Sequence, residues 1–280
     1  MIVFALGVGA YSVGSTLYFS GLFRKPTSGL MRAARLALGL GALAHALYIL
    51  WTSFLTHKCP IESMHFALSA SALVMVAVFW ALGPRFRVEP LGALVGPIGL
   101  AFWIAAEFLG KSGIVPRVPR FWLSLHIAAN LLGVGLFLLA GVASAFYLYV
   151  ERNLKRKSTT LIPGAMPALD SLDLTAYRLL ILGYPFLTFG VVTGGMFLSE
   201  LNFAHPTELL RPLLGYSSWL LLGLVLLWRG PLGNRGRKSA IGTLLGVSCV
   251  LLLLLLYLSG EGQGSAASAA STVGSGERAV

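Results

Sequence analysis

Histidines and carboxylates are the side chains in this sequence that could do chemistry, and they are few. Five histidines stand among 280 residues that include only 10 aspartates and glutamates. Neutral imidazole is a standard ligand of haem iron, and it also donates or accepts hydrogen bonds. The five histidines are His45, His57, His65, His126 and His205.

His126 follows Trp122 at the start of a long apolar run. Asn130 comes four residues later, a spacing that puts both polar side chains on one face of a helix. One interpretation of His126 is a haem ligand. The other, which spacing alone favours, is an interfacial histidine that hydrogen-bonds a lipid headgroup or a loop carbonyl.

His45 and His65 each admit the same two kinds of interpretation. His45 lies inside an apolar run near Tyr48 and Trp51, where a hydrogen bond between helices is favoured over a ligand role. His65 follows Glu62, and the polar rim of a helix start is the favoured interpretation there.

A polar connection, Ser199–Arg211, is the third candidate site. It joins two apolar segments and carries Glu200, His205 and Glu208. This pattern predicts either a ligand-binding loop or only the polar cap of two helices.

Motifs of common enzymes and metal sites are absent from the sequence. It contains no CxxCH, HExxH, GxSxG or phosphate-binding glycine loop. Cys59 and Cys249 fall in a connection and in an apolar run, which argues against a disulfide. We expect no covalent c-type haem, no metal site and no catalytic residue of the chain's own.

The composition indicates which structural elements position these polar side chains. The chain is 56% hydrophobic and 11% charged, whereas soluble domains carry about 25% charged residues. Apolar runs of roughly 20 residues are long enough to cross a bilayer as helices. The sequence predicts an all-α polytopic membrane protein with eight spans: Ile2–Phe23, Leu36–Leu55, Met64–Leu82, Leu91–Leu109, Phe121–Val150, Leu179–Leu198, Pro212–Trp228 and Ile241–Leu258.

The net charge of +11 indicates membrane orientation rather than a nucleic-acid partner. Most of the 21 lysines and arginines lie in the connections after the first, third, fifth and seventh spans. The positive-inside rule then places these connections in the cytoplasm and both termini outside. Four of the five histidines fall at or near the outer face, and only His45 lies near mid-membrane.

Two regions follow from this reading. Residues 1–258 form an eight-helix transmembrane domain. Residues 259–280 are rich in Gly, Ala and Ser and predict a disordered tail.

Several stretches, in this order, resemble the cytochrome c assembly protein family, especially its cytochrome c synthetase subunit and HemX-like members. They are His45–Tyr48, Cys59–Met64, Trp122–His126 with Gly133 and Tyr147–Arg152, and Leu182–Gly190 with Thr193–Gly195. The likeness covers about Leu36 to Leu258.

The resemblance implies a membrane protein that binds haem b non-covalently at its outer face for delivery to apocytochrome c. In that family two outward histidines flank a tryptophan-rich loop. The first corresponds to His126, the loop to Glu200–Arg211, and a mid-membrane histidine to His45. The loop here has no tryptophan, and Tyr257 stands near the place of the second outer histidine; His205 is a substitute candidate.

Three functions remain open at this stage. The first is haem binding or handling in cytochrome c assembly, in a bacterial inner membrane, with haem, apocytochrome c and other biogenesis proteins as partners. The second is a HemX-like accessory or regulatory role without haem transfer. The third is small-solute transport, for which Pro97 and Pro185 are the only indication.

Overall fold

A computed structural model describes residues 2–23, 27–56, 64–86, 88–109, 120–157, 167–196, 206–230 and 233–276. Side chains are not described at 23, 56, 64–67, 109, 120, 124, 206–208 and 257–276. Throughout these ranges the regular structure is helical, and no strand occurs. The helices are α1 (Ile2–Phe23), α2 (Ser28–Thr56), α3 (Met64–Leu82), the 3₁₀ turn η1 (Glu89–Leu91), α4 (Gly92–Leu109), α5 (Arg120–Lys155), α6 (Leu169–Gly195), α7 (Pro206–Arg229) and α8 (Arg237–Gly276).

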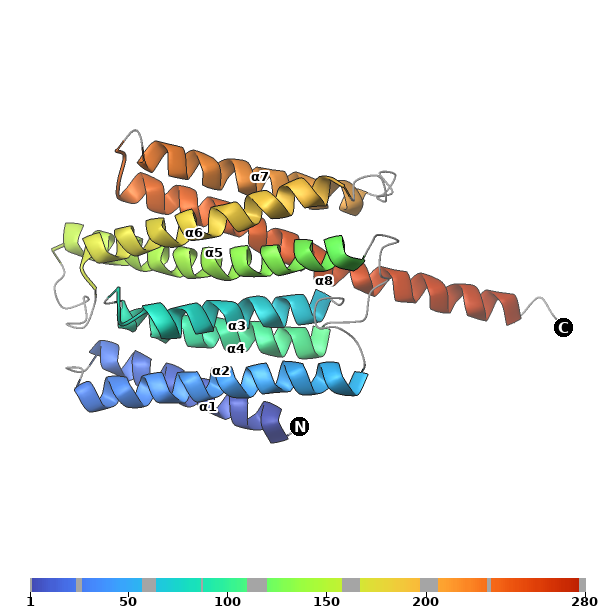
Figure 1. Cartoon of the computed structure of the whole chain (residues 1–280), viewed down its shortest axis with the longest axis horizontal. Helices are drawn as coiled ribbons and strands as arrows, with labels where there is room; N and C mark the ends of the chain where they lie inside the picture. Colours follow the sequence, from blue (N-terminus) through green and yellow to red (C-terminus); the bar gives the residue numbers. More distant parts are fainter. Residues whose placement is uncertain are drawn as a thin grey trace.

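The predicted all-α, eight-helix architecture is confirmed. Seven helices are long and apolar enough to cross a membrane, and the described apolar part of α3, Leu68–Leu82, is shorter. Helices suit this setting because each satisfies its backbone hydrogen bonds internally, without water. α1 begins and α8 ends at the same end of the bundle (Figure 1). Which side of the membrane that end faces stays a prediction.

The eight helices pack as two groups of four (Figure 1). In the first quartet, α1–α4, both α1 and α3 contact α2 and α4. In the second quartet, α5–α8, both α5 and α7 contact α6 and α8. Each quartet therefore has the cyclic packing of an up-and-down four-helix bundle. Contact between α3 and α5 provides most of the seam between the quartets.

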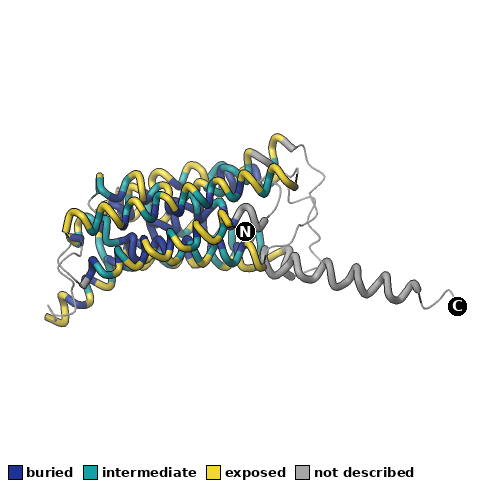
Figure 2. Tube along the Cα trace, turned by 90° about the horizontal axis from the view of Figure 1, so that it is seen from below, coloured by how far each residue is buried: buried dark blue, intermediate teal, exposed yellow. Residues whose placement is uncertain are grey.

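α5 is the most enclosed of the membrane-length helices. The apolar window of α5 is 67% buried, whereas that of α7 is 17% buried. Exposed residues follow the outside of the bundle in Figure 2. Large apolar side chains such as Leu40 and Leu227 are exposed there, as expected of a lipid-facing surface.

Glycines allow α5 to approach its neighbours closely. A Cβ atom at Gly183 of α6 would lie 2.7 Å from Cε1 of Phe137. A Cβ atom at Gly135 of α5 would lie 2.6 Å from Val74 on α3. Membrane helices lack a hydrophobic force between them, so such small residues permit the van der Waals contact that holds them together.

The last helix is longer than the predicted span. α8 continues to Gly276, past the predicted limit at residue 258, and its side chains are described only as far as Leu256. The division into residues 1–258 and a tail of residues 259–280 stays a prediction.

Candidate functional site

His126 lies in the second turn of α5 and faces the last turn of α6. Its Nδ1 atom is 2.8 Å from Oγ1 of Thr193. The imidazole also hydrogen-bonds the backbone of Gly190, one turn earlier on α6. His126 is half-buried, whereas Thr193 is buried. Contacts from α6 therefore fix the imidazole at one end of the second quartet.

Asn130 holds the same imidazole from its own helix. Nδ2 of Asn130 donates a hydrogen bond of 2.9 Å to the main-chain oxygen of His126. The same nitrogen lies 3.2 Å from Nε2 and 3.4 Å from Nδ1 of the ring. Because Nδ2 of Asn130 is almost equidistant from both ring nitrogens, it lies over the face of the His126 imidazole. The spacing predicts that the side chains of His126 and Asn130 lie on one face of the helix, and these contacts confirm it.

Two glycines near the end of α6 make room for these side chains. A Cβ atom at Gly190 would overlap the carboxamide of Asn130. One at Gly194 would come within 3.2 Å of Cε1 of His126. Gly195 follows immediately and meets only Tyr216 Oη, at 3.5 Å. The surface of α6 beside His126 is therefore largely backbone.

An aromatic pair links α6 to α7 next to this region. The rings of Tyr184 and Trp219 are stacked, with centroids 6.1 Å apart. The indole N–H of Trp219 donates to Oγ1 of Thr188 at 3.0 Å. These contacts fix the relative rotation of α6 and α7 along the segment that leads to Thr193.

The polar connection between α6 and α7 lies outside the described residues. Glu200 and His205 belong to it, and Glu208 lies in the first turn of α7 with its side chain not described. Their part in a site stays a prediction.

His45 occupies a closed site in the first quartet. Its side chain is 0% exposed. Nδ1 lies 3.3 Å from Tyr11 Oη on α1, and Nε2 lies 2.7 Å from Ser69 Oγ on α3. The ring stacks on Trp103 of α4, with centroids 4.0 Å apart and planes 13° apart. His45 thus contacts all three other helices of its quartet.

Both ring nitrogens of His45 are engaged in those hydrogen bonds. A metal ion at either nitrogen would displace Tyr11 or Ser69 and would leave a buried hydroxyl without its partner. His45 and His126 also lie in different quartets. The structure does not bring them together, and the interhelical bond expected of His45 is present.

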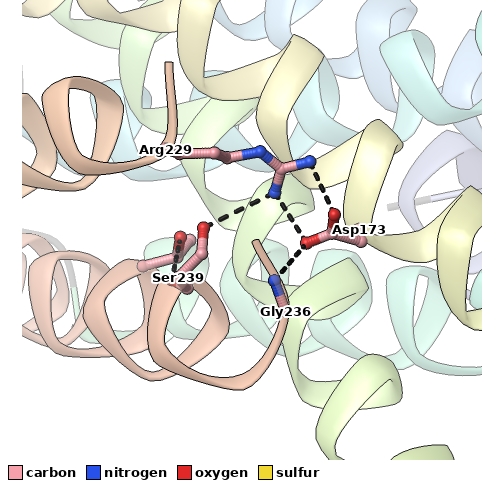
Figure 3. A network of polar contacts seen from close by, with 5 residues as sticks. Asp173, Arg229, Gly236 and Ser239 are labelled. Carbon is pink, nitrogen blue, oxygen red and sulfur yellow. Dashed lines mark hydrogen bonds and ion pairs between the residues drawn. The ribbon is translucent and has the colours of Figure 1, made fainter. Parts of the chain in front are cut away.

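A buried ion pair at the opposite end of the second quartet is absent from the sequence-based prediction. Arg229, at the end of α7, binds Asp173 of α6 through two parallel bonds, Nη1–Oδ1 at 2.7 Å and Nη2–Oδ2 at 2.8 Å (Figure 3). The backbone N–H of Gly236 donates to Asp173 Oδ1 at 3.3 Å. The guanidinium also lies 4.4 Å from the ring centroid of Tyr177.

This ion pair joins helices and offers no room for a ligand. Ser239 of α8 accepts a weak bond of 3.5 Å from Arg229, so α6, α7 and α8 meet here (Figure 3). The lining side chains leave no space for a water molecule. One signal could have found the pair: Asp173 is one of only 10 acidic residues, and it precedes an apolar span by two turns.

A multi-residue metal site is not formed by the part of the chain that is described. No three His, Cys, Asp or Glu residues there are close enough to share an ion.

Comparison with known proteins places this chain in a family. A family model described as "Cytochrome C assembly protein" matches residues 35–262. "Protein HemX" of Brevibacillus brevis is 27% identical over 233 residues, which are 78% of this chain and 83% of that protein. "Cytochrome c biogenesis protein CcsA" of Prochlorococcus marinus is 23% identical over 256 residues, 82% of each chain.

A further relative is less identical in sequence. "Cytochrome c biogenesis protein CcsA" of Trieres chinensis is 20% identical over 215 residues, 65% of this chain and 69% of that protein. No solved structure matches the chain. The family resemblance predicted from the residues is confirmed, and the match covers α3 to α7 whole, most of α2 and the first part of α8. This chain belongs to the cytochrome c assembly protein family.

Proposed function

We propose that this chain handles haem during the assembly of c-type cytochromes and that His126 is an axial ligand of that haem. The observation that carries the proposal is the placement of His126, half-buried near the start of α5 and fixed by Thr193 and Asn130. Family membership and relatives named as cytochrome c biogenesis proteins support the pathway.

The residues around His126 fit a haem. A neutral imidazole nitrogen is a common axial donor to haem iron. Gly194 and Gly195 present backbone rather than bulky side chains beside it, which suits the approach of a flat ring. When bound, haem supplies the redox-active iron. The protein's part is to provide the ligand, the orientation and an apolar setting.

The finer assignments follow from the sequence. The haem is haem b, as the family resemblance implies, and it is held non-covalently, because the chain has no CxxCH. His205 is the candidate second ligand, and Glu200 and Glu208 are polar neighbours of it along the chain. His45 is assigned a structural role, since Tyr11 and Ser69 engage both of its ring nitrogens.

The cellular setting is part of the proposal. The chain is a multi-pass protein of a bacterial inner membrane, with its basic connections in the cytoplasm. The His126 end of the second quartet then faces outward, where apocytochrome c and other biogenesis proteins are the partners. Within a haem-attachment machinery, the part of this chain is to bind and orient the haem and not to supply a nucleophile.

Haem titration of the full-length protein in lipid nanodiscs tests the proposal. We expect a Soret band to saturate with the wild type and to be lost with His126→Ala. His205→Ala should weaken binding, and His57→Ala is the matched histidine control that should not. Imidazole added to His126→Gly should restore the band. A wild type without a Soret band, or His126→Ala with wild-type affinity, would contradict the proposal.

A HemX-like accessory role is the second candidate. It is favoured by the relative named "Protein HemX", which this chain covers over 83% of its length. In this role the protein acts by contact with a partner and binds no haem. Cross-linking in the native membrane followed by mass spectrometry should then recover a partner from protein that shows no Soret band.

A further inference from the structure

The hydroxyl of Thr193 has one proton and a choice of acceptors. Its Oγ1 lies 2.7 Å from the carbonyl oxygen of Phe189 and 3.2 Å from that of Gly190, both in its own helix. A carbonyl oxygen only accepts hydrogen bonds, whereas a hydroxyl both donates and accepts. The hydroxyl proton is therefore directed at the α6 backbone, and Oγ1 turns a lone pair toward His126.

The imidazole must then donate across the gap between the helices. Nδ1 of His126 faces this lone pair at 2.8 Å. Neutral imidazole carries one N–H, so a proton on Nδ1 leaves the lone pair on Nε2.

Asn130 limits how the ring can turn. Its carboxamide nitrogen lies over the ring face and is anchored to the main-chain oxygen of His126. A ring flip would move Nδ1 away from Thr193 and break the 2.8 Å contact. One side chain from each helix thus sets the orientation of the imidazole.

We propose that Thr193 is the positioning residue that fixes His126 as the Nδ1–H tautomer, so that Nε2 is the atom presented to haem iron. The proposal rests on the function proposed above and deepens it. Metal-bound histidines usually donate their other N–H to a nearby acceptor, which fixes the tautomer and raises the basicity of the ligand. Here that acceptor is a threonine hydroxyl of the neighbouring helix.

Nitrogen NMR reads the tautomer without haem. Full-length protein labelled with ¹⁵N-histidine gives separate signals for protonated and unprotonated ring nitrogens, and the signals missing from His126→Gln belong to His126. We expect the proton on Nδ1 in the wild type and a mixture of tautomers in Thr193→Val. A wild type with its proton on Nε2 would overturn the proposal. This result needs no variant at Thr193, so it holds even if Thr193→Val does not fold.

Haem binding gives the second test. Thr193→Val keeps the shape of the side chain and removes the acceptor, and it should weaken haem binding about 10- to 100-fold. It should also raise the haem reduction potential, because a less basic ligand stabilises ferric iron less. Thr193→Ser keeps the hydroxyl and should restore both values.

The outcomes separate the two proposals. Suppose that Thr193→Val binds haem with the affinity and reduction potential of the wild type, while His126→Ala does not bind haem. This result would overturn the role of Thr193 but not that of His126. Loss of haem binding equally in Thr193→Val and Thr193→Ser would also overturn it, because the hydroxyl would then not be the deciding group. No haem binding by the wild type would overturn both.

Discussion

Arg229 and Asp173 face each other at the junction of α6, α7 and α8 as a bidentate, buried ion pair, with bonds of 2.7 and 2.8 Å. Asp173 lies near the start of α6 and Thr193 near its end, about 30 Å apart at 1.5 Å per residue. The buried ion pair and the candidate haem site therefore lie at opposite ends of α6.

Removing one member of this pair should strongly destabilise the second quartet. Asp173→Asn leaves the Arg229 guanidinium buried without its counter-ion, which costs about 3–5 kcal/mol. We expect a clear fall in the unfolding midpoint in detergent. Lys155→Ala is the control, because it breaks an ion pair whose lysine is 62% exposed, and such pairs contribute only about 0–1 kcal/mol. Equal effects of the two variants would contradict the prediction.

Enlarging Gly190 should disturb the contact between α5 and α6. The added methyl group of Gly190→Ala would overlap Asn130, and such overpacking typically costs about 1–3 kcal/mol. Haem affinity should fall with it, since Asn130 supports His126. Gly9→Ala is the matched control, because it adds the same methyl group at a position of α1 where no neighbouring atom lies within 4 Å of the new Cβ atom. The comparison is made by unfolding and by haem titration, and the idea fails if Gly190→Ala behaves as Gly9→Ala does.

His45 and His126 should differ in what their loss affects. His45→Ala removes a fully buried ring together with the partners of Tyr11 and Ser69, so we expect a loss of stability of about 2–4 kcal/mol. His126→Ala should abolish the Soret band and leave the unfolding midpoint nearly unchanged. Measuring both quantities on both variants decides the assignment. A stable His45→Ala protein that cannot bind haem would make His45 a ligand.

Membrane orientation can be checked with single cysteines. Asn234, in the connection between α7 and α8, is exposed, and the basic residues around it predict a cytoplasmic location. In a background where both native cysteines are replaced by serine, Asn234→Cys should react with an impermeant maleimide only after the cells are opened. A cysteine added before Met1 should react in intact spheroplasts. The reverse pattern would invert the proposed orientation.

Hydrophobicity predicted the existence and order of the helices well, and their ends less well. The bounds of α1 and α3 agree with the predicted spans. α2 begins at Ser28 instead of Leu36, and α6 begins at Leu169 instead of Leu179. Charged residues such as Arg32 and Asp173 mark where a helix leaves the hydrocarbon, not where its backbone hydrogen bonds stop.

Spacing along the sequence predicted one of the two residues that contact His126. Asn130 was found as the neighbour of His126 because both lie on one helix, four residues apart. Thr193 could not be found in this way. It lies 67 positions from His126, and the contact depends on how α5 and α6 are rotated about their axes. The pairing of Asp173 with Arg229 was missed for the same reason, since it spans 56 positions.

The boundary between the quartets falls at one connection of the chain, the one between α4 and α5. Each quartet encloses its own buried polar centre, His45 with Tyr11 and Ser69 in one, and Asp173 with Arg229 in the other. Between them, contacts run mainly through α3 and α5, with Gly135 seated against Val74. Expressed as two separate polypeptides cut within residues 110–119, the halves should insert independently and reassociate along that seam.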